Sequence, residues 1–190
     1  MSRFFALIVL VALSSFAYSE KLSGVVKAGG TSAVVLEPVS AKPSPAPSQT
    51  VMLDQRGLKF MPPLLVIQQG TTVEFRNSDT ASHNVFWPNI SGNKKLGHNL
   101  GTAPSGQTQR FKFENPGNVP ILCNIHPEMT ANIVVSPSPD FAQTDATGAY
   151  SINDVPEGAY KATAWHNGKA TTESITVKGD TKLDFALSAK

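Results

Sequence analysis

Short apolar segments separated by turn residues constrain the fold of this chain most strongly. Each segment is rich in β-branched and aromatic residues and is bounded by Gly, Pro, Asn or Asp, which is typical of strands. No amphipathic helical pattern longer than two turns appears. The sequence therefore predicts an all-β chain built from sandwiches or barrels. The clearest expected strands are Leu64–Gln68, Thr71–Arg76, Gln109–Phe113, Val119–Cys123 and Ala131–Val135.

Residues 1–19 have the pattern of a signal peptide. Arg3 precedes the apolar run Phe4–Leu13, and the small residues Ala17 and Ser19 follow at the spacing that signal peptidase requires. The run is too short to cross a bilayer, and no later stretch reaches the roughly 18 apolar residues of a transmembrane helix. We expect cleavage near Ser19, export to the periplasm or the extracellular space, and a mature chain that does not span the membrane.

Two Pro-rich breaks divide the remaining sequence. The first lies within Ser40–Ser48 and the second at Pro137–Pro139. Residues 50–136, between the breaks, are long enough for one domain. Residues 137–190 contain strand and turn patterns of their own and predict a second, smaller β-sandwich.

Residues 20–49 fit two arrangements. They contain two possible strands, Leu22–Lys27 and Ser32–Glu37, ahead of the first Pro-rich break. These strands can form a hairpin that completes the small sandwich, in which case the middle domain is an insertion. Alternatively, they add a free N-terminal strand to the sheet of the middle domain.

Charge and cysteine content narrow the function. The chain carries 16 Lys and Arg against 14 Asp and Glu, a net charge of +2 with neutral His, which gives no support for a nucleic-acid partner. It contains a single Cys. In an oxidising compartment an unpaired thiol must be buried, joined to a second chain or bound to a metal.

That Cys begins a motif with three possible metal ligands. Cys123, His126 and Met129 are each three positions apart on one short segment. A thiolate, an imidazole and a thioether that face one point suit copper, and two His with one Cys and a weak axial Met are the ligands of blue-copper sites. The motif therefore predicts one copper ion.

The second imidazole must come from another segment. His83 follows the expected strand Thr71–Arg76 and its turn, so it can lie above the Cys loop. His98 stands in a similar His-Asn-apolar context and is the alternative ligand, but it lacks such a preceding strand and turn. We expect His98 to be an exposed loop residue and His166 to be exposed to solvent.

The paired motifs resemble the plastocyanin and amicyanin branch of the cupredoxins. His83-Asn84-Val85 lies upstream and Cys-x-x-His-x-x-Met downstream, and the Pro after His126 resembles the short amicyanin-type loop. The resemblance covers residues 50–136 and implies a Greek-key β-sandwich. It makes His83, Cys123, His126 and Met129 the ligands of one type 1 copper ion, with Asn84 linking the two ligand loops.

The C-terminal segment resembles a second family. Its Thr-Asp-x-x-Gly-x-Tyr and Val-Pro-x-Gly-x-Tyr patterns are similar to the carboxypeptidase-regulatory-like or transthyretin-like sandwiches, which have an immunoglobulin-like fold. A cupredoxin-like segment followed by this tail resembles exported proteins described as methylamine-utilisation-like. That description does not establish a role in amine oxidation.

These patterns favour an electron carrier over two other classes. The resemblance implies a protein that passes single electrons between redox protein partners, with His126 as the exit route. A copper chaperone or storage protein is the alternative, although Met-rich or His-rich tracts are lacking. An enzyme is disfavoured because the sequence offers no His-x-His pair for a further copper cluster.

Overall fold

The structure is a computed structural model that describes residues 20–40, 44–45 and 47–187. The expected signal peptide, residues 1–19, lies outside the described residues. The regular elements of the described chain are all strands except one short 3-10 helix, η1 (Lys94–Leu96), so the all-β prediction is confirmed. Within these ranges no helix is long and apolar enough to cross a membrane.

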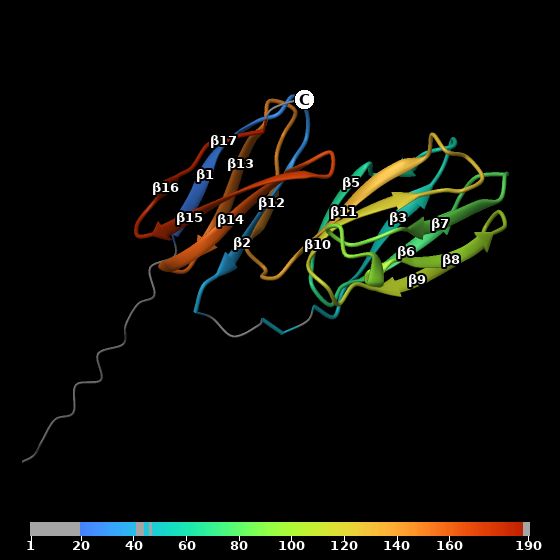
Figure 1. Ribbon diagram of the computed structural model, residues 1–190, viewed down its shortest axis with the longest axis horizontal. Helices are drawn as coiled ribbons and strands as arrows, with labels where there is room; N and C mark the ends of the chain where they lie inside the picture. The colour runs from blue at the N-terminus through green and yellow to red at the C-terminus, as the bar shows by residue number, and fades with distance from the viewer. Residues whose placement is uncertain (1–19, 41–43, 46, 188–190) are drawn as a thin grey trace, which may run out of the picture.

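The middle of the chain forms a sandwich of two sheets (Figure 1). One sheet has the order β5-β11-β10-β7-β8 and the other β4-β3-β6-β9. Their inner faces bury one core that includes Phe75, Phe113 and Ile121. The strands are β3 (Thr50–Gln55), β4 (Phe60–Met61), β5 (Leu64–Gln68), β6 (Thr72–Asn77), β7 (His83–Trp87), β8 (His98–Ala103), β9 (Thr108–Lys112), β10 (Gly117–Leu122) and β11 (Thr130–Ser136).

A second sandwich contains both ends of the described chain. One sheet has the order β13-β1-β16 with β17 also paired to β1, and the other β12-β2-β14-β15. A separate core that includes Leu22, Leu36 and Val177 fills it. The strands are β1 (Glu20–Lys27), β2 (Ala33–Pro38), β12 (Phe141–Gln143), β13 (Ala149–Val155), β14 (Gly158–His166), β15 (Lys169–Val177), β16 (Thr181–Lys182) and β17 (Phe185–Ala186).

The two N-terminal strands belong to this second sandwich. β1 pairs antiparallel with β13 and parallel with β16 and β17, whereas β2 lies between β12 and β14. In Figure 1 both blue strands lie among the orange and red ones. In the described part of the chain neither strand pairs with residues 50–136.

The expected N-terminal hairpin is wrong in one respect. β1 and β2 lie in different sheets, so they do not pair with each other. Gly29 and Gly30, with positive φ of 72° and 118°, let the connecting turn cross from one sheet to the other. The connection is therefore a crossover between the two layers of the sandwich.

The two sandwiches touch along a small apolar seam. Ala33 and Val35 of β2 pack with Val134 of β11, and Leu64 and Trp165 flank this cluster. The loop from β10 to β11 lies at the far end of the middle sandwich from this seam (Figure 1). The seam therefore leaves that loop uncovered.

Candidate metal centre

Neighbouring strands bring the expected ligands together. His83 is the first residue of β7, and Cys123 directly follows β10, which pairs with β7 through Leu122 and Phe86. The chain then turns back into β11, and the Met129 amide donates to the His126 carbonyl at 3.0 Å. The sheet thus places the end of β10 beside the start of β7.

Three donor atoms converge on one point. The ligand atoms of His83, Cys123 and His126 all lie within 4.8 Å of one another, the one such group in the part of the chain that the structure describes. The two Nδ1 atoms are 3.1 Å apart, and Cys123 Sγ lies 4.0 Å from His126 Nδ1. Metal bonds of about 2.0 Å to nitrogen and 2.3 Å to sulfur in a trigonal plane separate donors by about 3.5 Å. The observed separations fit a single ion held by two nitrogens and one sulfur.

Asp79 fixes the orientation of His83. Its Oδ2 lies 3.0 Å from His83 Nε2, so the other ring nitrogen, Nδ1, faces the sulfur and the second imidazole. The Leu58 backbone N–H donates to the same carboxylate at 2.9 Å. The pKa of Asp79 lies below its usual value, mainly because of this bond from Leu58 and next because of the hydrogen bond with His83. Asp79 was not predicted from the sequence, where its only signal is an acid in the turn four positions before a ligand His.

Asn84 connects the two ligand segments, as the resemblance implies. Its backbone N–H donates to Cys123 Sγ at 3.4 Å, and its Oδ1 accepts from the Asn124 N–H at 3.4 Å. Its Nδ2 donates to Asn99 Oδ1 at 2.9 Å. An N–H aimed at the sulfur stabilises a thiolate, the form that binds metal.

The site is closed on most sides. The exposed fractions of His83, Cys123 and Met129 are 0%, 3% and 1%, and the last two belong to the core of the middle sandwich. His126 is partly exposed, and it is the one of the four expected ligands that reaches the surface. Met129 lies buried at the end of the loop, directly before β11.

The two other candidate imidazoles lie elsewhere. His98 begins β8, paired with Trp87 at the opposite end of β7 from His83, and its exposed ring contacts the Trp87 and Phe111 rings. It is exposed as expected, but in a strand. His166, at the end of β14, is half-buried and not exposed as expected, because Ser32 and Thr31 hold its ring.

Comparisons with known proteins agree with this geometry. Residues 48–136 match the family "Copper binding proteins, plastocyanin/azurin family", and residues 141–184 match "Polysaccharide lyase family 4, domain II". Amicyanin-alpha of Methylorubrum extorquens is 30% identical over 125 residues, which cover 65% of this chain and 99% of that protein.

Two solved structures are similar to about half of the chain. Amicyanin from Paracoccus versutus is 22% identical over 53% of this chain and 97% of its own, with a TM-score of 0.42. A copper-containing nitrite reductase from Thermus scotoductus SA-01 is 28% identical over 52% of this chain, with a TM-score of 0.43. The matched part spans only 25% of that reductase chain.

A β-sandwich with two imidazoles and one thiolate at the ends of adjacent strands defines a cupredoxin, a copper-binding protein. The match to amicyanin-alpha, which covers 99% of that protein, identifies the family within this class. It belongs to the plastocyanin/azurin family of copper-binding proteins, and copper is its cofactor.

Proposed function

We propose that the chain is an exported carrier of single electrons, with one type 1 copper ion held by His83, Cys123, His126 and Met129. The observation that carries this proposal is the convergence of three donor atoms within 4.8 Å in a site where only His126 reaches the surface. Copper in such a site supplies a one-electron cycle between two oxidation states. A buried donor set leaves little room for a substrate, which favours a carrier over an enzyme.

The surrounding residues keep the donors in place during that cycle. Asp79 holds the His83 ring, and the Asn84 N–H supports the Cys123 sulfur. The link from Asn124 to Asn84 ties the loop to β7. Donors that stay fixed by such outer hydrogen bonds keep the rearrangement between the two oxidation states small.

Electrons leave through His126 in this proposal. Its neighbours Ile125, which is 44% exposed, and Pro127, which is exposed, offer apolar surface next to the partly exposed ring in the same loop. Transient redox complexes use small interfaces of this kind. We propose a redox protein of the periplasm or extracellular space as the partner.

We also propose that the copper domain, residues 50–136, is inserted into a sandwich made by residues 20–49 and 137–190. The pairing of β1 with β13 and of β2 with β14 supports this division. Each Pro-rich break then joins one sandwich to the other.

The visible spectrum of the mature protein with Cu(II) tests the electron-carrier proposal. We expect an intense thiolate-to-copper band that is lost in Cys123→Ser and His83→Ala and kept in His98→Ala. A reversible one-electron potential should accompany the band. Loss of the band in His98→Ala but not in His83→Ala refutes the ligand assignment, and a colourless protein that prefers Cu(I) favours a chaperone or storage role.

A further inference from the structure

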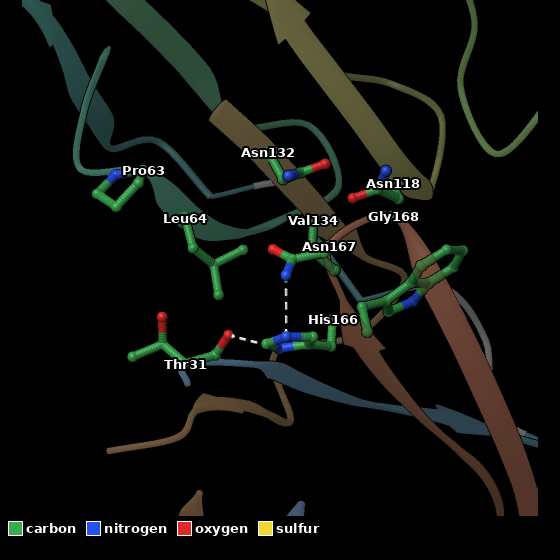
Figure 2. A pocket seen from close by; sticks show the side chains of 10 residues that line it. Thr31, Pro63, Leu64, Asn118, Asn132, Val134, His166, Asn167 and Gly168 are labelled. Carbon is green, nitrogen blue, oxygen red and sulfur yellow. Dashed lines mark hydrogen bonds between the residues drawn. The ribbon is translucent and has the colours of Figure 1, made fainter. Parts of the chain in front are cut away.

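A cleft lies at the seam between the two sandwiches. It has a volume of about 470 Å³ and opens where the turn from β14 to β15 meets the outer face of β10 and β11. A recess of about 70 Å³ adjoins it and shares part of its wall, including Asn118, Asn132 and Asn167 (Figure 2). Small-molecule sites have volumes of roughly 300–1,000 Å³, so the cleft is large enough for a ligand.

Asn118 supplies a buried acceptor without a partner. The residue is 6% exposed and lines both the cleft and the recess. Its backbone is fixed because its N–H donates to Ser91 Oγ at 2.9 Å and its carbonyl accepts from the Ser91 N–H at 2.8 Å. In the described chain its side-chain Oδ1 has no hydrogen-bond partner. Buried oxygens of this kind are rarely left unpaired, so a hydrogen-bond donor that enters the cleft would satisfy it.

Two further amides border the same space. Asn132 projects from β11, and Asn167 occupies the turn after β14 with a positive φ of 47°. Asn167 Nδ2 lies 3.0 Å from His166 Nε2, and His166 Nδ1 lies 3.1 Å from the Thr31 carbonyl. Figure 2 shows Asn118, Asn132 and Asn167 around one opening, with the His166 ring at its base. The hydrogen bonds of His166 thus fix the direction of the Asn167 amide.

The walls carry no carboxylate, ammonium or guanidinium group. Among the described residues that line the cleft and the recess, none is Asp, Glu, Lys or Arg. Trp165 is half-buried and adds an aromatic surface to both. An anionic ligand would lack a cationic partner here, whereas a neutral ring with hydroxyl groups can donate to the amide oxygens and pack its C–H face on the indole.

We propose that this cleft is a binding site for a neutral oligosaccharide, with Asn118, Asn132 and Asn167 as hydrogen-bonding residues and Trp165 as the stacking surface. None of the four expected copper ligands lines the cleft or the recess, although Leu122 and Thr130 in the cleft wall adjoin Cys123 and Met129. The inference therefore goes beyond the electron-carrier function and does not depend on it.

Calorimetric titration of the reduced, copper-loaded mature protein tests the proposal. The probes are cellohexaose, maltohexaose and chitopentaose, with trigalacturonic acid as a charged comparison. We expect at least one neutral probe to bind and the charged probe not to bind. Asn118→Leu and Trp165→Ala should each weaken binding about tenfold, since one buried hydrogen bond or one aromatic contact is lost. Asn153→Leu removes an exposed amide outside the cleft and should bind as the parent chain does.

Thermal unfolding separates a binding role for Asn118 from a structural one. Because Asn118→Leu removes a buried unpaired oxygen, its unfolding temperature should equal or exceed that of the parent chain. The proposal is overturned if no neutral probe binds, if binding is unchanged in Asn118→Leu, or if only the charged probe binds. The copper band reports independently on the metal site and should be the same in all variants.

Discussion

Replacing Gly24 by Ala tests whether β1 is an integral part of the small sandwich. Gly24 lies in the middle of β1, next to the segment that joins β16 to β17. A Cβ atom on Gly24 would lie 1.7 Å from the Leu183 carbonyl oxygen and 2.6 Å from its carbonyl carbon. Carbon and oxygen in contact are normally about 3.3 Å apart, so the two backbones must separate by about 1.5 Å.

The separation breaks the hydrogen bonds that join these segments. The Leu183 N–H donates to the Ser23 carbonyl at 2.9 Å, and the Tyr150 hydroxyl donates to the Leu183 carbonyl at 2.8 Å. The Val25 N–H donates to the Asp184 side chain at 2.9 Å. At about 1 kcal/mol for each bond, the free energy of unfolding falls by about 3 kcal/mol. For a domain of this size that corresponds to a Tm about 15 °C lower.

Far-ultraviolet circular dichroism during heating measures this loss, and the visible copper band at 20 °C provides the second measurement. Gly158→Ala is a matched control in β14, because its Cβ would meet only the Tyr160 ring at 3.6 Å, an ordinary contact. We expect Gly24→Ala to melt about 15 °C below the parent chain, with the copper band unchanged and the control close to the parent. An unchanged Tm refutes the close packing of β1, and a lost copper band shows that β1 supports the metal site instead.

Three further substitutions probe the metal site, the small sandwich and the core of the copper domain. Asp79→Asn removes a negative charge beside His83. The interaction of that charge with the metal site amounts to about 2 kcal/mol at an effective dielectric constant of about 20, and solvent screening lowers this value. Cyclic voltammetry should therefore show a reduction potential about 50 mV higher, and an equal or lower potential contradicts this account. The Thr147 hydroxyl and the Ala149 N–H lower the pKa of Asp145 from 3.8. The ionised carboxylate therefore stabilises the fold above that pH, and this stabilisation disappears as the pH falls through the lowered pKa. Asp145→Asn should accordingly reduce the fall in unfolding temperature below pH 4. Phe113→Ala should cost about 3–5 kcal/mol in urea denaturation, because a fully buried ring is lost, and a smaller cost means that the core collapses around the cavity.

Strands and ligand segments could be predicted because their signals are local. The run Leu64–Gln68 forms β5 with the same bounds as expected, and its neighbours in the copper domain differ by only a few residues. Cys123, His126 and Met129 belong to one loop, so their spacing alone indicated that they bind the same metal ion. The choice of His83 over His98 needed only the preceding strand and turn, and the structure places His83 beside Cys123.

Contacts between distant segments could not be predicted in this way. The spacing of Leu22–Lys27 and Ser32–Glu37 suits a hairpin equally well, and only the partners β13 and β14 place them in different sheets. Asp79 was missed because its role depends on a 3.0 Å contact with His83 and on the Leu58 N–H, both set by tertiary packing. The residues of a turn predict that the chain reverses direction, but they do not predict which side chain of the turn contacts the site.

The positions of the chain crossings explain how two sandwiches can share one chain without disturbing the metal. The chain leaves the small sandwich after β2 and returns to it between β11 and β12, from the end of β11 opposite to the ligand loop. Cys123, His126 and Met129 belong to the loop at the opposite end of β10 and β11. The seam cleft runs along the outer face of both strands from Asn118 and Asn132 as far as Leu122 and Thr130, the residues next to Cys123 and Met129. Because β10 and β11 are paired along six consecutive residues, the cleft and the ligand loop are built on one pair of strands, and the spectrum of each cleft variant also reports whether a change in the cleft reaches the metal site.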